Sequence, residues 1–420
     1  MTDSEVVVAG GGLAGLVAAS RLAEAGREVT LFEREPEVGG RVRSTRADGF
    51  TFDRGFQVLF TAYPAAKREL DYDDLDLRAF SPGAVICRGD QRSTLGDPFR
   101  DLGALVPSVL NREVTTADKL RTLRLSTELR KTSVEDIFAA EDATIEESLA
   151  ARGFSRKYVD RFVRPFYGGI TLDRSLGTSK RVFEFTFKML SEGKTVVPAD
   201  GMGAITEQLA DRAERAGVTI ETGTPVEAVR ADEPAVEIPG ETVDADAVVV
   251  AADPKSSRDL TGVDAIPTEA KGCVTQHFAV PEGHPVADSD RIHLNAGGDV
   301  PNTVAAMSGV ADEYAPDGSA LVAATTVGRR DESDGDLETR TRDALSSWFP
   351  AASLGDFQLL RTDRIDFAQF AQPPGVHETL PDVRDPDGAV YLAGDYTENS
   401  SINGALESGA NAAKAVDDDL

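Results

Sequence analysis

The sequence predicts an α/β protein in which one parallel sheet is assembled from separate segments of the chain. Residues 6–15 form an apolar run that leads into a Gly-x-Gly-x-x-Gly turn. Residues 389–395 form a second apolar run, which ends in Gly-Asp. Between them, a helix-like segment at 205–216 precedes a buried-type strand at 243–251. We therefore expect a chain that begins in a dinucleotide-binding fold, leaves it and returns to complete it.

The glycine-rich turn near the N-terminus has the residue types that a bound pyrophosphate requires. Gly10 allows a tight turn after the strand, Gly12 lets the backbone approach phosphate groups, and Gly15 lets the next helix pack on the strand. That helix begins at Leu13 and Ala14, and its N-terminus would present free N–H groups and partial positive charge to the phosphates.

The acidic residue that such a site needs follows at the expected distance. The first helix is expected over residues 13–25, and a second strand over residues 28–32 ends at Glu33. An acidic side chain in this position accepts hydrogen bonds from ribose hydroxyls. The alternative is a solvated carboxylate at the end of a strand.

A Gly-Gly-Arg run comes next. Gly39 and Gly40 permit a further close backbone approach to the same ligand, and Arg41 can neutralise pyrophosphate charge. Arg34, which follows the glutamate, is included among the predicted cofactor-binding residues. NAD-binding domains do not require this second element.

The order of these motifs resembles that of the flavin amine oxidase superfamily, which includes amine oxidases, protoporphyrinogen oxidases and phytoene-desaturase-like enzymes. Members carry the glycine-rich turn, the glutamate and the Gly-Gly-Arg run near the N-terminus, and Gly-Asp or Gly-Glu near the C-terminus. The segments between the motifs follow a similar order, so the resemblance spans most of the chain at the level of the fold. It implies FAD as the cofactor.

The resemblance also implies a division of the chain into two interleaved domains. A Rossmann-like FAD-binding domain would combine residues 1–60, 195–260 and 378–420. An inserted α+β substrate domain, with a helical layer and an antiparallel sheet, would combine residues 61–194 and 261–377.

Further site residues are carried over by position. Gly55, Phe56 and Gln57 match the segment that passes the flavin ring, although a turn packed on the sheet is the alternative. Val226 matches the valine that contacts the adenine through its backbone.

The C-terminal motif is expected to close the site. Asp395, after Gly394, would bind a ribitol hydroxyl. Gly404 and Ala405 would begin a helix whose N-terminal dipole stabilises negative charge on a reduced flavin. The alternative is an ordinary strand, glycine turn and helix.

Periodicity predicts the other elements. Helices are expected at 102–109, 116–130, 133–139, 144–151, 155–166 and 337–349. Strands are expected at 218–222, 225–229, 273–280, 303–307 and 321–327.

The residues expected near the flavin depart from the amine oxidase pattern. In register with the family, Ala368 and Ser401 occupy the places of the aromatic pair that guides an amine. Phe367 falls where some members carry the cysteine that binds FAD covalently, so we expect non-covalent FAD. Lys271 is a weak candidate for the lysine that holds a water near the flavin, and a surface lysine is the main alternative. No general base is indicated.

A basic and aromatic segment favours an apolar substrate. Residues 152–188 carry nine bases against three acids, interleaved with aromatic side chains. Such a segment could line an apolar tunnel or contact an anionic membrane surface peripherally. The simpler alternative is a set of core aromatics whose neighbouring bases pair with acids.

The sequence therefore predicts an FAD-dependent oxidoreductase that moves a hydride from a substrate carbon to the flavin and dehydrogenates or isomerises a polyprenoid or carotenoid-like substrate. Two alternatives stay open: an amine oxidase with an atypical aromatic cage, and a flavin-binding protein without turnover. The sequence does not indicate the electron acceptor.

Composition restricts the remaining function classes. The 420 residues carry a net charge of −28, which disfavours nucleic-acid partners and suggests a salt-adapted protein; an ordinary acidic enzyme is the alternative. Two cysteines and four histidines show no metal-site spacing, so no metal is expected. We find no signal peptide and no apolar run of membrane-spanning length, and expect a cytoplasmic protein.

Overall fold

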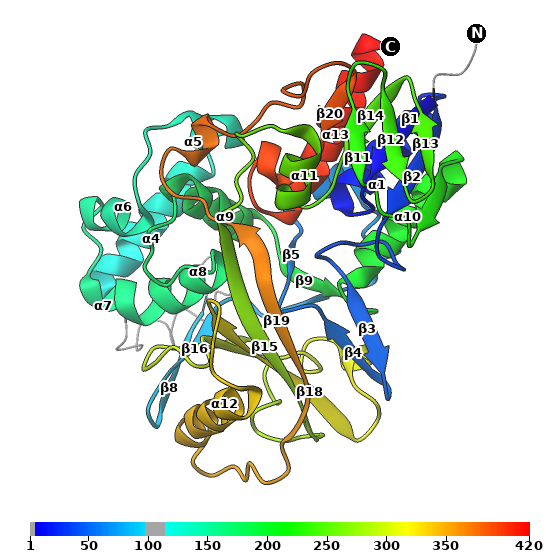
Figure 1. Ribbon diagram of the computed structural model, residues 1–420. Coiled ribbons are helices and arrows are strands. Elements are labelled where there is room, and N and C mark those ends of the chain that lie inside the picture. The colour runs from blue at the N-terminus through cyan, green and yellow to red at the C-terminus, as the bar shows by residue number, and fades with distance from the viewer. Residues whose placement is uncertain (1–4, 97–113) are drawn as a thin grey trace.

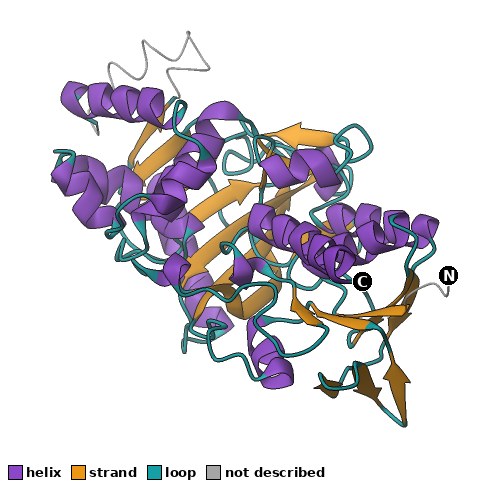
Figure 2. Ribbon diagram, turned by 90° about the horizontal axis from the view of Figure 1, so that it is seen from above, coloured by secondary structure: helices purple, strands orange, loops and turns teal. Residues whose placement is uncertain are grey.

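The protein is described by a computed structural model that covers residues 5–96 and 114–420 (Figure 1). The helix expected at 102–109 lies outside the described residues. In both views a group of helices lies at the end of the molecule opposite the two chain termini (Figures 1 and 2). Long strands run from the middle of the molecule toward its lower end in this view (Figure 1).

The sheet that carries the predicted nucleotide site is parallel, with five strands in the order β10-β2-β1-β14-β20. The strands are β1 (Glu5–Ala9), β2 (Glu28–Glu33), β10 (Thr219–Thr222), β14 (Ala247–Val250) and β20 (Val390–Leu392). Three distant parts of the chain thus contribute to one sheet. The central strands are continuous apolar runs because a parallel sheet is buried on both faces.

Three helices accompany this sheet: α1 (Leu13–Glu24), α10 (Gly203–Ala216) and α13 (Ile402–Asp419). Helix α1 contacts both of the others, and its Leu16, Val17 and Leu22 side chains are fully buried. The small residues of α13 allow close contact: a Cβ on Gly409 would lie 2.3 Å from the carbonyl oxygen of Ala14.

The strand expected at 243–251 is two strands. A small antiparallel sheet contains β11 (Ala228–Arg230), β12 (Ala235–Ile238) and β13 (Glu241–Asp244), and the chain then enters β14 of the parallel sheet. Asp246 lies between β13 and β14. Its side chain accepts a hydrogen bond from the Glu5 N–H at 2.9 Å, which links this connection to the start of β1. Helix α11 (Pro254–Thr261) follows.

The second large sheet has seven strands in the order β19-β15-β18-β17-β16-β7-β8. They are β7 (Ala84–Arg88), β8 (Gln91–Leu95), β15 (Ala270–Pro281), β16 (Ile292–Asn295), β17 (Thr303–Ala306), β18 (Ser319–Val327) and β19 (Gln358–Phe370). All neighbours are antiparallel except β16 and β7, which are parallel. Helix α12 (Asp334–Trp348) packs against this sheet (Figure 1).

The expected helical layer is present. It contains α4 (Thr116–Leu129), α5 (Val134–Ala139), α6 (Ile145–Ala151), α7 (Arg156–Tyr158), the π-helical turn η2 (Val159–Val163), α8 (Arg164–Ile170) and α9 (Lys180–Glu192). The first four helices begin where a Ser or Thr side chain accepts a hydrogen bond from an N–H of the first turn.

Residues 61–194 are less helical than expected. Besides α2 (Pro64–Glu69), they contain β7, β8 and β6 (Leu77–Ala79). Strand β6 joins a short sheet with β5 (Leu59–Phe60) and β9 (Thr195–Pro198). The limits of the two predicted domains stay a prediction.

Candidate cofactor site

The glycine-rich turn has the shape that a pyrophosphate requires. Gly12 is the N-cap of α1, and in the described part of the chain no side chain caps this helix N-terminus. A Cβ built on Gly12 would meet no heavy atom of the described residues within 4 Å, whereas one on Gly15 would lie 1.9 Å from the Gly10 carbonyl oxygen. Gly15 therefore serves close packing, and Gly12 borders open space in front of the helix. This arrangement fits the phosphates of FAD.

Glu33 lies beside this turn at the end of β2. Its side chain is 7% exposed. One carboxylate oxygen accepts a hydrogen bond from the Gly11 N–H at 2.7 Å, and the other accepts one from the Glu35 N–H at 2.9 Å. Each oxygen keeps a second lone pair, so the carboxylate can still accept ribose hydroxyls.

The Gly-Gly-Arg run folds back on the glycine-rich turn. The Gly39 N–H donates to the Gly11 carbonyl at 2.8 Å. Gly39 and Gly40 have φ values of +120° and +56°, which other residues rarely adopt. A Cβ on Gly40 would lie 3.4 Å from the Cα of Gly12, so the two turns border the same space. Arg34 Nη2 lies 3.3 Å from Oδ2 of Asp253, and its contact with the cofactor stays a prediction.

Arg41 joins the two ends of the chain. Its Nη2 lies 2.6 Å from Oδ1 of Asp395, and its Nη1 donates to the Ala368 carbonyl at 3.2 Å. Burial opposes the charge of Arg41, but the attraction and hydrogen bond of Asp395 raise its pKa above the usual value. The structure thus brings these two predicted cofactor residues together from opposite ends of the sequence.

The segment expected to pass the flavin lies next to this pair. Gly55 has a φ of +85°, and a Cβ on it would lie 2.8 Å from Cδ1 of Ile365 on β19. The Phe56 ring packs edge-on against Phe80. Gln57 Nε2 donates to the Arg41 carbonyl at 2.8 Å, while its Oε1 is buried and has no hydrogen-bond partner among the described residues. A buried acceptor without a partner fits a ligand that supplies a donor.

At the C-terminal motif, Asp395 also accepts a hydrogen bond from Ser400 Oγ at 2.8 Å. Ser401 caps α13 by accepting the Gly404 N–H at 2.9 Å. A Cβ on Gly404 would lie 2.1 Å from the Asn399 carbonyl oxygen, so this position requires glycine. Ser401 is therefore a helix cap at the position where the family pattern has an aromatic residue.

Four other predicted residues lie in helix starts or against the apolar core. Leu13 and Ala14 are buried in the first turn of α1, and Ala405 lies partly buried in the first turn of α13. Val226 precedes β11 and is partly buried against the apolar cluster around Val7. No ligand contact of these residues is tested by the structure.

Lys271 lies on β15 opposite Gln369 of β19. Its Nζ is 3.6 Å from Asp173, and its side chain is 29% exposed. Gln369 in turn donates to the Ile170 carbonyl at 2.7 Å. The lysine thus sits where β15, β19 and the end of α8 meet, and its role near a flavin stays a prediction.

The basic and aromatic segment mostly matches the simpler alternative. Its bases pair with acids, as Arg152 does with Glu128 and Glu184, and Arg164 with Glu146. Its aromatic rings form a chain of contacts through the helical layer. Membrane contact therefore stays a prediction. No helix in the described ranges is long and apolar enough to cross a membrane.

The sequence analysis missed a buried hub at Asp53. This side chain is 3% exposed and accepts hydrogen bonds from Ser44 Oγ at 2.6 Å, the Met202 N–H at 2.8 Å and Tyr314 Oη at 2.8 Å. Burial raises the pKa of Asp53, and these hydrogen bonds offset part of that effect. An acid inside an apolar strand, Phe-Thr-Phe-Asp, was the available signal.

A family model for flavin-containing amine oxidoreductases matches residues 13–417. The chain belongs to this family. Membership confirms the predicted superfamily, the α/β fold with its two kinds of sheet, the FAD cofactor and the oxidoreductase class. Among the described residues, no cluster of three or more His, Cys, Asp or Glu side chains could hold a metal ion.

The sequence identity to individual relatives is low. A carotenoid 3,4-desaturase from Haloarcula japonica is 28% identical over 285 residues, 60% of this chain and 56% of that protein. Protoporphyrinogen oxidase 2 from Arabidopsis thaliana is 30% identical over 172 residues, 40% and 33% of the two chains. The matches thus span about half or less of these relatives. An oxidoreductase structure from Methanosarcina mazei has a TM-score of 0.71, 18% identity, and coverage of 98% and 100%.

Proposed function

We propose that this protein removes a hydride from a carbon of an apolar, polyprenoid-like substrate and dehydrogenates or isomerises it at a C–C bond. The observation that carries the proposal is a small apolar cluster beside Gly55, at the end of the seven-stranded sheet. Leu172, Cys273, Val327, Ile365 and Ala368 form a cluster there. An apolar surface next to the flavin segment suits a hydrocarbon better than an amine. The resemblance to a carotenoid desaturase supports the same choice.

The chain's own residues bind and orient the reactants. The turn at Gly12 and the N-terminus of α1 would hold the pyrophosphate, Glu33 a ribose, and Asp395 the ribitol chain. Gly55 and Gln57 would lie along the flavin, and the apolar cluster would exclude water from the reacting carbon. Bound FAD supplies the two-electron chemistry.

An amine oxidase is the second candidate, and Lys271 beside Asp173 is the observation that keeps it open. The residues in the aromatic-pair positions argue against it. Ala368 belongs to the apolar cluster, and Ser401 caps a helix. Neither residue can form the aromatic walls that guide an amine.

Flavin reduction tests the proposal. FAD-loaded protein in high salt is mixed anaerobically with a polyprenoid, a porphyrinogen and a primary amine in turn, and flavin absorbance is followed. We expect bleaching with the polyprenoid alone. Bleaching with the amine alone would replace the proposal with the amine oxidase reading, and a flavin that nothing reduces would favour a binding protein without turnover. Protein without added substrate is the control.

We further propose that the protein is adapted to salt. Its 72 acids and 44 bases leave strong self-repulsion at low ionic strength. Raising KCl from about 0.1 M to about 2 M should therefore raise the midpoint of thermal unfolding, because the screening length falls to a few ångström. An uncharged osmolyte at equal osmolarity is the control. Full stability at very low ionic strength would contradict the proposal.

A further inference from the structure

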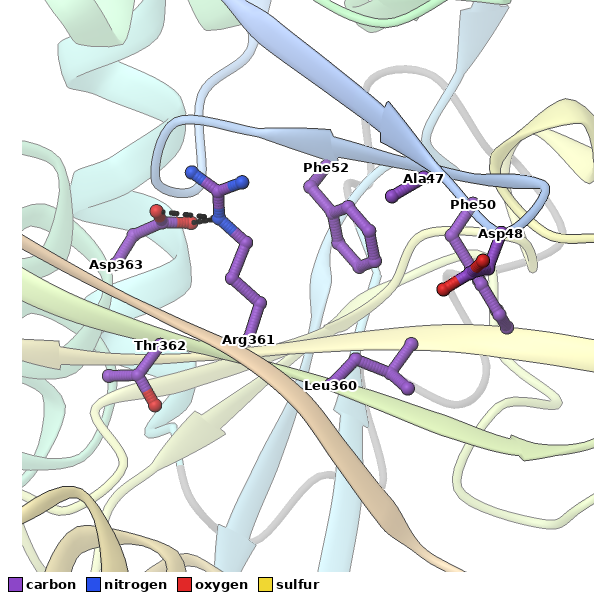
Figure 3. Close-up of a pocket in the computed structure, with 8 residues that line it drawn as sticks. All are labelled: Ala47, Asp48, Phe50, Phe52, Leu360, Arg361, Thr362 and Asp363. Atoms are coloured by element: carbon purple, nitrogen blue, oxygen red, sulfur yellow. Dashed lines mark hydrogen bonds and ion pairs between the residues drawn. The ribbon is translucent and has the colours of Figure 1, made fainter.

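The apolar cluster beside Gly55 is closed on one side by a hairpin. The hairpin strands are β3 (Ser44–Ala47) and β4 (Phe50–Asp53). The Phe52 ring packs edge-on against buried His277, with centroids 5.3 Å apart, and a Cβ on Gly55 would lie 3.9 Å from Oγ1 of buried Thr275. A pocket between the hairpin and β19 lies beyond this contact (Figure 3). The packed hairpin separates that pocket from Gly55.

On another side, the cluster is closed by Leu172. The other four members lie on β15, β18 and β19, so Leu172 is the residue that the helical layer contributes. Cys273 is paired with Val327 on one neighbouring strand and with Ile365 on the other. Leu172 packs on this row and is 9% exposed.

The open edge of the cluster lies next to the segments expected to hold FAD. Ile365 and Ala368 are partly exposed, whereas the other three members are buried. A Cβ on Gly55 would lie 2.8 Å from Cδ1 of Ile365, and the Ala368 carbonyl accepts a hydrogen bond from Arg41 at 3.2 Å. A substrate carbon brought to the flavin at this edge therefore meets the side chains of the cluster.

Leu172 has a backbone conformation that leucine rarely adopts. Its φ is +52°, and it directly follows Thr171, the C-cap of α8. The Asp173 N–H donates to the Gly168 carbonyl at 2.9 Å, which is the hydrogen bond of a Schellman ending. Glycine usually takes the left-handed position of such an ending, because a Cβ there approaches the next carbonyl oxygen. The helix ending thus gains nothing from a leucine side chain, whereas the cluster gains a wall.

A second leucine of the same loop provides an internal comparison. Leu176 has a φ of +61°, so its backbone is strained in the same way. It is fully buried and belongs to the main hydrophobic core rather than to the cluster beside Gly55. Between the two leucines, Asp173 accepts a hydrogen bond from the Ser175 N–H at 2.9 Å and lies 3.6 Å from Lys271 Nζ. The loop is therefore fixed, and Leu172 is held against β15 and β19.

We propose that Leu172 determines the width of the substrate that fits beside the flavin, so that the site accepts an open-chain isoprenoid and excludes a ring. The proposal rests on the function proposed above and adds a specificity to it. The leucine side chain narrows the space between the end of α8 and the row that contains Ile365. A rigid wall of this kind discriminates by steric exclusion, which costs a wide ligand more than a slender one.

Equilibrium binding of two isomeric alcohols to the FAD-loaded protein tests the proposal. Geraniol is an open-chain isoprenoid, and borneol has the same composition but is a compact bicyclic molecule. Binding is read from the shift of the oxidised flavin band, without turnover. We expect the native protein to bind geraniol about tenfold more tightly than borneol. Leu172→Gly should shift this ratio about tenfold toward borneol, since glycine suits the backbone and removes the wall.

Leu176→Gly is the matched control. It relieves the same backbone strain but removes a side chain from the main core. It should lower the midpoint of thermal unfolding and keep the ratio of the native protein. Val327→Ala is a second test that leaves the loop intact: it widens the cluster from the sheet side and should shift the ratio in the same direction as Leu172→Gly.

An unchanged ratio in Leu172→Gly, with both alcohols still bound, would overturn the role of Leu172 and leave the proposed function standing. An equal shift in Leu176→Gly, or tighter binding of borneol by the native protein, would overturn it as well. If Leu172→Gly does not fold, an unchanged ratio in Val327→Ala would have the same meaning. Failure of the native protein and all variants to bind either alcohol would contradict the proposed function, and this inference with it.

Discussion

Gly12→Val is expected to abolish FAD binding while the apoprotein stays folded. Gly12 has φ −80° and ψ −177°, an extended conformation that valine adopts readily. Its new Cβ would meet no described heavy atom within 4 Å, so the loss of stability should stay below about 1 kcal/mol. The side chain would instead fill the space in front of α1, where the pyrophosphate is expected.

The affinity for FAD should fall at least about a hundredfold, because charge-assisted hydrogen bonds to the phosphates contribute roughly 1.5–3 kcal/mol each. Titration of apoprotein with FAD, followed by flavin fluorescence, measures the loss, and thermal unfolding of the apoprotein checks the fold. Gly15→Ala is the contrasting variant. Its Cβ would collide with the Gly10 carbonyl oxygen at 1.9 Å, so it should lose stability and FAD together. Native affinity in Gly12→Val would remove the pyrophosphate from this turn.

Asp53→Ala is expected to lower the free energy of unfolding by about 3 kcal/mol or more. The substitution leaves two buried donors, the Met202 N–H and the Tyr314 hydroxyl, and the half-buried Ser44 hydroxyl without this acceptor, and each buried unsatisfied group costs roughly 1–3 kcal/mol. Met202 is the N-cap of α10 and Tyr314 lies beyond β17, so the hub ties the β3–β4 hairpin to segments 149 and 261 residues away in the sequence. FAD affinity should fall as well, since Gly55 lies two residues after Asp53.

Urea unfolding measures this effect against two controls. Tyr314→Phe removes one donor and should cost about 1 kcal/mol. Arg46→Ala, on the same hairpin but exposed, should stay within about 0.5 kcal/mol of the native protein. Equal stability of Asp53→Ala and Arg46→Ala would show that the hub does not hold the fold together.

The hub also gives the stability a dependence on pH with a defined sign. Burial raises the pKa of Asp53, so the folded protein holds the proton more tightly than the unfolded chain. The contribution of Asp53 is fully present below its unfolded pKa of 3.8 and is lost as pH rises through the folded pKa. As pH rises from about 4, the unfolding free energy of the native protein should therefore fall relative to that of Asp53→Asn, which has no titrating group at this position.

Local motifs were predictable to within a residue or two. The sequence predicts a turn at Gly12 and a helix at 13–25. The structure has Gly12 as the N-cap of α1, which spans Leu13–Glu24. The strands on either side match as well. These contacts lie within about 30 residues, and apolar runs bounded by glycines leave few alternatives.

Elements with mixed polarity were not predictable. Strand β19 carries Arg361, Asp363, Arg364 and Asp366, which hide any apolar alternation. It forms because β15 pairs along most of its length. Strand β7 likewise lies in a span expected to be mostly helical, and it pairs with β16, about two hundred residues later. Such pairings depend on distant partners, so propensity alone cannot identify them.

The sequence by itself determined the cofactor turn and the family, because the need for glycine at Gly12 and Gly15 is a local requirement of the backbone. Only the tertiary structure decided that Arg41 meets Asp395 and that Asp53 accepts hydrogen bonds from the Met202 N–H and the Tyr314 hydroxyl. Each of these contacts joins residues more than a hundred positions apart in the sequence. Their positions depend on which strands pair and on which face each strand presents, and the packing of the whole chain determines both.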